Sequence, residues 1–169
     1  FNHIAQPGLV AKVIGGHWGL VPGLQRLAIE NQIQAYNLPQ GVISHLCRDI
    51  SAGKPGTISK IGLGTFVDPR LEGGRVNSVT TEDIVEVINF MGEEYLFYHR
   101  FALDFALLRG TTADEDGNIT MQDEALTICN QVAAAACHNS GGKVIVQVKE
   151  IVPRGKLHPQ MVKIPGIYV

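Results

Sequence analysis

The alternation of short apolar runs with segments of helical period constrains the fold more than any other feature of the sequence. Residues 10–14 form an apolar run that predicts a strand, and Pro22-Gly23 then begins a helix that continues to Asn31. Residues 33–36 predict a second strand, and apolar residues at helical spacing predict a helix from 39 to about 52. Strands that alternate with helices form parallel sheets covered by helices, so the pattern predicts an α/β fold with an open, mostly parallel sheet.

The rest of the chain continues this alternation after one long interruption. Residues 53–79 are rich in glycine and proline, which predicts a long structured loop of the kind that often carries function. No internal repeat or second domain is visible, so residues 1–169 are expected to form a single domain. The further expected elements are a helix at 84–88 capped by Thr80 and Asp83, strands at 94–98, 103–108, 143–148 and 167–169, a hairpin turn at 114–118 that joins 106–108 to Ile119, and a helix at 122–138.

Composition excludes several classes of partner. The chain has 45% hydrophobic and 18% charged residues and a net charge of −2, which suits one globular domain and gives no basic surface for nucleic acid. The three cysteines form no CxxC pair, which argues against a disulfide framework or a zinc site and predicts a reducing cytoplasm. Apolar runs are far shorter than the ~20 residues of a membrane helix, so no membrane partner is expected.

Motifs that resemble ligand sites fail on geometry. Asp114, Asp116 and Asn118 have the spacing of calcium-loop ligands, but the glycine falls fourth instead of sixth, and a hairpin turn is favoured. The six histidines show no metal-binding arrangement, so no metal is expected. Residues 15–19 form a glycine-rich turn that could hold an anion on backbone N–H groups, but this turn is not a GxGxxG motif.

Six segments in order nevertheless carry a specific resemblance that covers nearly the whole chain. They are Gly15-Gly16-His17-Trp18-Gly19, Tyr36-Asn37-Leu38-Pro39-Gln40-Gly41, Gly62-Leu63-Gly64-Thr65-Phe66-Val67-Asp68-Pro69-Arg70 with Gly73-Gly74, Arg109-Gly110-Thr111-Thr112-Ala113-Asp114, Gly117-Asn118 and Ile164-Pro165-Gly166. The series resembles the alpha-type, N-terminal half of the coenzyme A transferases that include the acetate, propionate and 3-oxoacid enzymes. The single-chain acetate and propionate type is the most similar.

The resemblance implies an enzyme that moves coenzyme A from a short-chain acyl-CoA to another carboxylic acid by a ping-pong reaction. In this family a glutamate attacks the acyl-CoA thioester and becomes a glutamyl-CoA thioester through an anhydride. The implied metabolism is that of short-chain fatty acids and ketone bodies, with acetate, propionate or acetoacetate as acids. Coenzyme A is then a substrate, and no permanently bound cofactor is implied.

The same resemblance suggests which residues would meet the substrate. Gln40 and Gly41 stand where a strand passes into a helix, so a side-chain amide and backbone N–H groups could donate to a developing oxyanion. Gly62, Gly64 and Thr65 would allow close backbone approach to the acyl group, and Phe66 would form an apolar wall. The alternatives are that Gln40 only caps its helix and that the glycine-rich stretch is an ordinary bulged strand. Between residues 54 and 75, four cations against two anions would also suit an anionic ligand, and a solvated charged loop is the alternative.

The catalytic glutamate of the relatives lies in a Glu-Asn-Gly context in the beta-type half, and this tripeptide does not occur in the chain. None of the nine glutamates is therefore nominated as the nucleophile. We expect the chain to be an incomplete alpha-type half that is inactive alone, needs the beta-type half as partner, and belongs to a homo-oligomer. A non-catalytic CoA-binding or assembly domain of the same fold is the alternative, and a nucleotide-binding α/β module is a third hypothesis.

Overall fold

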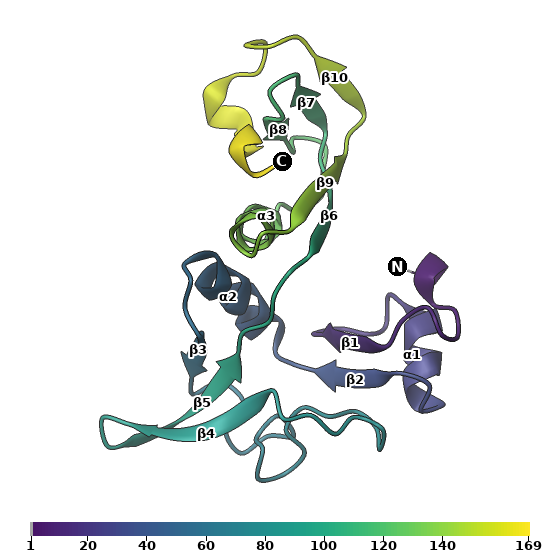
Figure 1. Ribbon diagram of the computed structural model, residues 1–169, viewed down its shortest axis with the longest axis vertical. Coiled ribbons are helices and arrows are strands. Elements are labelled where there is room, and N and C mark those ends of the chain that lie inside the picture. The colour runs from purple at the N-terminus through teal and green to yellow at the C-terminus, as the bar shows by residue number, and fades with distance from the viewer. Residues whose placement is uncertain (1) are drawn as a thin grey trace. The chain divides into compact units, whose positions relative to one another are not determined.

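The computed structural model describes residues 2–169 (Figure 1). Contacts within the chain divide it into two compact units. The first unit holds the chain up to Leu46 together with Gly56–His99, and the second holds Cys47–Pro55 and Arg100–Val169. Over residues 2–169 no helix has the length and apolar character needed to cross a membrane.

The first unit begins with a strand, helix and strand that match the predicted pattern. After a short 3-10 helix at Asn2–Ile4, β1 (Lys12–Gly15) pairs in parallel with β2 (Gln34–Asn37), and α1 (Pro22–Ile29) connects them. Proline suits the first turn of a helix because its fixed φ is already helical and its missing N–H has no partner to lose. The helix packs its apolar face on the two strands, and the resulting core contains Ala5, Leu24, Leu27, Ala28, Ile33 and Ala35.

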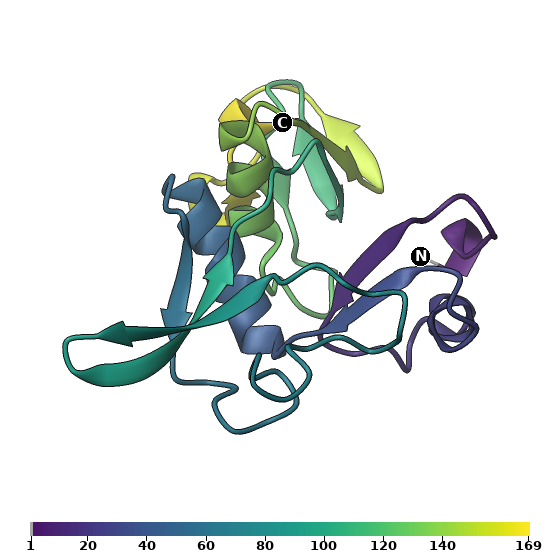
Figure 2. The ribbon, with the colours of Figure 1, turned by 60° about the horizontal axis from the view of Figure 1, so that its bottom comes forward.

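The chain then forms α2 (Gln40–Ser51), as predicted, followed by a three-stranded antiparallel sheet in the order β3 (Gly56–Ser59), β5 (Glu93–His99), β4 (Val85–Phe90). Figure 2 shows β4 and β5 running together as one long hairpin. Between β3 and β4 lies the long loop that the glycines and prolines predicted, but Gly56–Ser59, which were expected to be part of that loop, form β3.

The predicted helix at 84–88 is wrong, because residues 85–88 belong to β4. Val85 is buried while Glu86 is exposed, which is the alternation of a strand, and the backbone pairs with β5 along its whole length. Thr80 does not cap a helix either. Its hydroxyl is buried and accepts a hydrogen bond from the backbone N–H of Ala35 at 2.7 Å.

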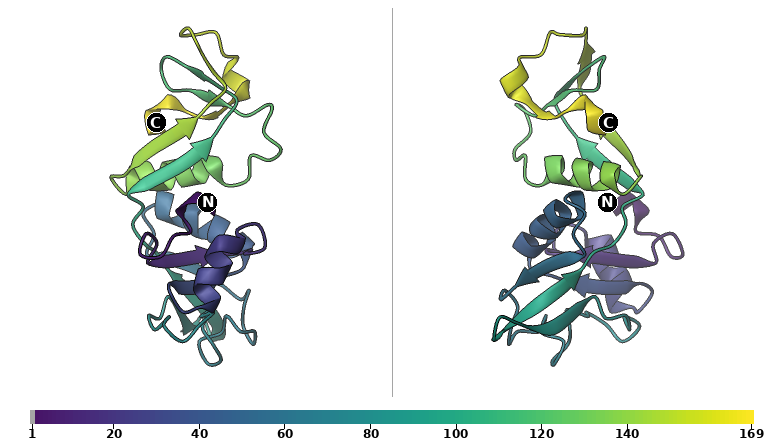
Figure 3. Two further views of the ribbon diagram at one scale, coloured as in Figure 1. Left: turned by 90° about the vertical axis from the view of Figure 1, so that its right-hand side faces the viewer. Right: turned by 60° about the vertical axis from the view of Figure 1, so that its left-hand side comes forward.

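The second unit contains a parallel pair of strands, β6 (Phe105–Arg109) and β9 (Lys143–Gln147), with α3 (Asn130–Asn139) along one face (Figure 3). Both strands and the helix follow the prediction, but the helix was expected to begin at residue 122. Ile128 has a φ of +36°, a left-handed value that a continuing α-helix cannot contain, so α3 begins after it. The core beneath the strands contains Ala106, Ala113, Ile119, Ala134, Cys137, Val144 and Ile164.

A four-stranded sheet in the order β10 (Glu150–Val152), β7 (Thr112–Asp114), β8 (Ile119–Thr120), β11 (Val162–Ile164) completes this unit. The predicted turn at 114–118 is confirmed, and Asp114 accepts hydrogen bonds from the backbone N–H groups of Asp116 and Asn118. However, the turn joins β7 to β8, not 106–108 to Ile119.

The predicted strand at 167–169 is also wrong. A 3-10 helix at Gly166–Tyr168 follows Pro165, after another at Pro159–Met161. Gly166 packs so tightly on the 114–118 turn that a Cβ there would lie 2.0 Å from the carbonyl oxygen of Asp116. The N–H groups of Tyr168 and Val169 donate to Pro165 O at 3.0 Å and to Gly166 O at 3.1 Å, which form the 3-10 turn in place of a strand.

Candidate functional site

The six predicted site residues come from two segments of the first unit, the start of α2 and the loop after β3. Because β1 and β2 are parallel, their carboxyl ends meet at one edge, where ligands of open α/β sheets usually bind. The turn from β2 into α2 is fixed at this edge from two sides. The N–H of Leu38 donates to Gly15 O at 2.9 Å, and the N–H of Asn37 donates to Gly74 O at 2.8 Å.

Gln40 is the first residue of α2 and is exposed. Its side chain lies directly over Gly16, where an added Cβ would stand 2.4 Å from Gln40 Oε1. The first N–H groups of a helix have no intrahelical acceptor and carry the positive end of the helix dipole, so Gln40 and Gly41 can offer backbone donors as well as the side-chain amide. These groups can bind a carboxylate or an oxyanion.

The loop that contains Gly62, Gly64, Thr65 and Phe66 is held to this turn through Gly74, whose N–H donates to Phe66 O at 2.9 Å. The hydroxyl of Thr65, an exposed residue, donates to Gly62 O at 2.8 Å. Phe66 is 42% exposed and can form an apolar wall. The structure therefore brings both predicted segments to one turn. The Thr65 hydroxyl, however, donates its hydrogen bond within the loop.

Asp68 organises this loop from inside. Its carboxylate is 1% exposed and accepts hydrogen bonds from the backbone N–H of Gly64 at 2.9 Å and of Arg70 at 3.1 Å. The guanidinium of Arg70 donates to both carboxylate oxygens, at 3.0 and 2.8 Å. These side-chain and backbone donors hold the pKa of Asp68 well below its usual range.

Gly62 has a φ of +103°, and a Cβ there would lie 2.6 Å from the hydroxyl oxygen of Tyr98. That hydroxyl donates to Ile61 O at 2.6 Å, and burial raises the pKa of Tyr98 to about 12. Glycine is therefore required at this position by both conformation and space.

The excess of cations between residues 54 and 75 does not leave free positive charge, because carboxylates from outside the segment also contribute. Each of the four cations has an acidic partner: Lys54 with Asp49, Lys60 with Glu93, Arg70 with Asp68 and Glu94, and Arg75 with Asp83. These ion pairs favour the alternative of a solvated charged loop over an anion site inferred from the charge count.

Two residues that matter at the turn were not nominated from sequence. Gly16 leaves room for the Gln40 side chain, and Asp68 accepts hydrogen bonds from the loop backbone. Both lie in the segments that carry the family resemblance. A charged residue two positions before an arginine in a glycine-rich loop could have suggested the role of Asp68, whereas the contact of Gly16 has no local signal.

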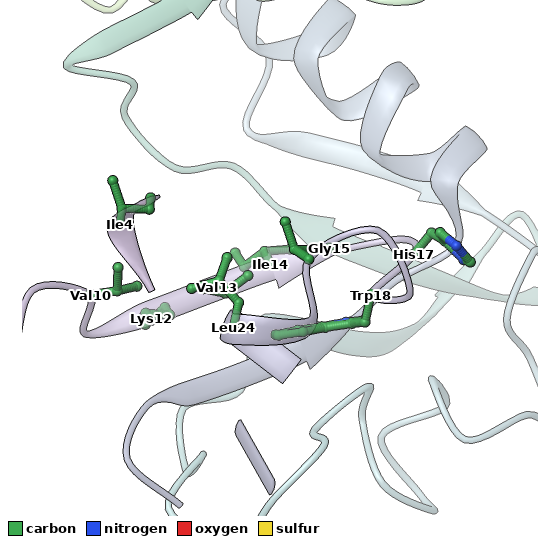
Figure 4. A pocket seen from close by; sticks show the side chains of 10 residues that line it. Ile4, Val10, Lys12, Val13, Ile14, Gly15, His17, Trp18 and Leu24 are labelled. Atoms are coloured by element: carbon green, nitrogen blue, oxygen red, sulfur yellow. The ribbon is translucent and has the colours of Figure 1, made fainter. Parts of the chain in front are cut away.

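The first unit also contains a largely apolar cavity of about 370 Å³ (Figure 4). It lies along β1 and α1, and Trp18 extends along it with a buried Nε1 that has no acceptor among residues 2–169. The lining residues are Ile4, Val10, Lys12, Val13, Ile14, Gly15, His17, Trp18, Val21 and Leu24. None of the six predicted residues lines this cavity.

Comparison with known proteins defines the class. Residues 2–169 match the family described as Coenzyme A transferase, and the chain therefore belongs to that family. It is 47% identical over 166 residues to acetate CoA-transferase YdiF of Escherichia coli K12 and 54% identical over 162 residues to caffeate CoA-transferase of Acetobacterium woodii. These matches cover 98% and 96% of this chain but 31% of each relative, so the chain spans about a third of their length.

Solved structures of coenzyme A transferases share the fold of this chain. The thioester complex with CoA of the acyl-CoA transferase YdiF from Escherichia coli O157:H7 superposes with a TM-score of 0.96 at 46% identity, over 99% of this chain and 33% of that one. Glutaconate coenzyme A-transferase from Acidaminococcus fermentans, at 17% identity and a TM-score of 0.76, covers 96% of this chain and 54% of that one and shares the fold. The predicted α/β class, that of the CoA-transferase alpha domain, is confirmed.

Proposed function

We propose that this chain is the alpha-type part of an enzyme that moves coenzyme A between a short-chain acyl-CoA and a carboxylic acid. The observation that carries the proposal is the exposed Gln40 at the start of α2, placed beside the carboxyl end of β1 in a member of the coenzyme A transferase family. The beta-type half of the same enzyme supplies the nucleophilic glutamate, so the chain alone is inactive.

The chemistry explains what Gln40 contributes. The glutamate carboxylate attacks the thioester carbonyl, and the CoA thiolate leaves to give an acyl-glutamyl anhydride. The thiolate then attacks the glutamyl carbonyl, which releases the first acid as its carboxylate and leaves a glutamyl-CoA thioester. A second carboxylic acid reacts with this thioester by the same steps in reverse, which forms the new acyl-CoA and frees the glutamate. Each attack creates an oxyanion, and the Gln40 amide with the N–H groups of Gln40 and Gly41 can stabilise this charge. Coenzyme A enters only as a substrate.

The glycine-rich loop completes this half of the acyl pocket. Gly62 and Gly64 keep the loop backbone free of side chains, and Asp68 fixes its conformation from the buried side. Phe66 offers an exposed ring for the acyl chain. Thr65 contributes through its bond to Gly62 O, which stabilises the loop.

The assembly is part of the proposal. One relative, 27% identical to this chain, is named as one of the subunits of the succinyl-CoA:3-ketoacid coenzyme A transferase of Helicobacter pylori, and that name implies a second kind of chain in the same enzyme. We propose a cytoplasmic homo-oligomer in which each alpha-type part meets a beta-type half. Light scattering of the full-length protein would give its oligomeric state, and a monomer would contradict this part of the proposal.

Gln40→Ala tests the site in the full-length protein. We expect acyl transfer to slow by roughly tenfold to a thousandfold, the range for loss of one oxyanion donor. The matched control is Gln25→Ala, which removes another exposed helical glutamine, on α1. Steady-state kinetics with acetate, propionate, caffeate and acetoacetate as acceptors would measure the effect, and an unchanged rate would reduce Gln40 to a residue that only begins the helix.

A second experiment separates the enzyme from a non-catalytic CoA-binding domain. The full-length protein is incubated with acyl-CoA and then with borohydride, which reduces a glutamyl thioester to an alcohol. Mass spectrometry should find one modified glutamate. A protein that binds CoA but shows no modified glutamate would favour the non-catalytic alternative.

A further inference from the structure

Because Gly16 has no side chain, the Gln40 side chain can occupy the space beside it. An ideal Cβ on Gly16 would lie 2.4 Å from Gln40 Oε1, 3.0 Å from Gln40 Cα and 3.1 Å from Gln40 Cβ. We infer that Gly16 is a positioning residue, which fixes where the Gln40 amide lies by carrying no side chain of its own. The inference rests on the proposed role of Gln40 and deepens it.

Gly16 is not glycine for conformational reasons. Its φ lies outside the left-handed region, in contrast to Gly62 and Gly64 in the loop, so an alanine there would meet no backbone strain. The requirement for glycine is therefore steric. The three nearest atoms to the added Cβ all belong to Gln40.

The backbone around Gln40 cannot easily retreat from an added methyl group. On the side of β1, the N–H of Leu38 bonds Gly15 O at 2.9 Å, which ties the turn to the residue next to Gly16. On the helix side, the N–H of Ile43 bonds Pro39 O at 3.1 Å and closes the first turn of α2. With both sides bonded, the group that can move is the Gln40 side chain, whose rotation would take the amide out of its place.

Gly15 provides a matched comparison one residue away. A Cβ on Gly15 would have its nearest contacts at 3.5 and 3.7 Å, both with Trp18, which are ordinary van der Waals distances. Its φ is also outside the left-handed region. Alanine at position 15 therefore adds the same methyl group to the same turn without touching Gln40.

The test compares four variants of the full-length protein: Gly16→Ala, Gly15→Ala, Gln40→Ala and the double variant Gly16→Ala with Gln40→Ala. We expect Gly16→Ala to lower kcat at least about tenfold while the KM for acyl-CoA changes by less than about threefold, because a misplaced donor is lost mainly in the transition state. Gly15→Ala should keep the normal kcat. The double variant should be no slower than Gln40→Ala alone, because residues that act through one another are not additive.

The outcomes separate this inference from the proposed function. A slow Gln40→Ala together with a normal Gly16→Ala overturns the role of Gly16 alone, as does a double variant in which the two effects multiply. A normal rate for Gln40→Ala overturns the role of Gln40 and the positioning role with it. If Gly16→Ala does not fold, the variant that combines it with Gln40→Gly, which removes both Oε1 and Cβ of residue 40, should recover folding, and failure of this combined variant to fold overturns the steric inference.

Discussion

At the scale of single residues, Asp68 is a buried carboxylate whose hydrogen bonds stabilise the loop. Its carboxylate accepts from the backbone N–H of Gly64 and from Nε and Nη2 of the Arg70 guanidinium. Asp68→Asn removes the charge and puts an amide donor against a cation, so we expect the free energy of unfolding to fall by about 2 kcal/mol. Urea unfolding of the full-length protein measures it, with Glu72→Gln, an exposed acid in the same loop, as the control.

The same residue predicts a pH dependence. The donors from Arg70 and Gly64 lower the pKa of Asp68 in the folded protein relative to the unfolded chain. The stability it contributes is therefore fully present above the unfolded pKa of about 4 and is lost as the pH falls toward the lower folded pKa. Below about pH 4, Asp68→Asn should lose less stability with falling pH than the unmodified protein does. Parallel declines would contradict this assignment.

Gly62 and Gly64 differ in a way that mutation can expose. Both have positive φ, of +103° and +70°, but only at Gly62 would a Cβ also collide, with Tyr98 and Leu96 at 2.6 and 2.9 Å. We expect Gly64→Ala to cost about 1 kcal/mol from strain and Gly62→Ala about 3 kcal/mol from strain and overlap together. Equal thermal and urea stabilities of the two variants would mean that overlap with Tyr98 adds nothing to the loss in free energy of unfolding.

At the scale of elements, sequence predicts best where the local pattern is also the pattern of burial. The strand, helix and strand from β1 to β2 and the helix α2 were predicted because Leu24, Leu27, Val42 and Leu46 repeat at helical spacing and are all buried. The residues of β4 could satisfy either period over such a short span. Pairing with β5 decides between them, and a hairpin partner is not visible in a local window.

Thr80 shows how a long-range contact replaces an expected local one. Its hydroxyl accepts from the N–H of Ala35 in β2 and donates to Asn77 at 2.5 Å. We expect Thr80→Ala to destabilise the full-length protein by about 2 kcal/mol, because the Ala35 N–H is left buried without an acceptor. Thr80→Ser keeps the hydroxyl and should lose less than half as much in urea unfolding. A serine variant as unstable as the alanine variant would point to the methyl group instead.

At the scale of the whole molecule, the candidate site could be proposed from the sequence because its residues lie in ordered motifs that resemble a family. The contacts among these residues could not be predicted from the sequence. The four cations of residues 54–75 looked like an anion-binding group until their partners, which include Asp49 and Glu94, were seen in the folded chain. Gly16 meets Gln40 because two parallel strands end at the same edge, a relation that spans more than twenty residues of sequence.

The parallel pair β6 and β9 leads to the last prediction. One face packs on α3, while the other exposes Phe105, Leu107 and Ile145, at 61%, 65% and 53%. Parallel strands are normally buried on both faces, so we predict that this apolar face is covered in the full-length protein. Leu107→Lys should then lower the free energy of unfolding by at least about 3 kcal/mol, because a cation would replace a buried leucine.

The matched control for this prediction is Met91→Lys. Met91 is 90% exposed at the tip of the hairpin between β4 and β5, where a cation can remain in water, so its stability should stay within about 0.5 kcal/mol of the unmodified protein. Both variants introduce the same side chain at an exposed apolar position of this chain. A difference between them in urea unfolding therefore reports whether the face at Leu107 is covered, and equal stabilities would show that it stays open to water.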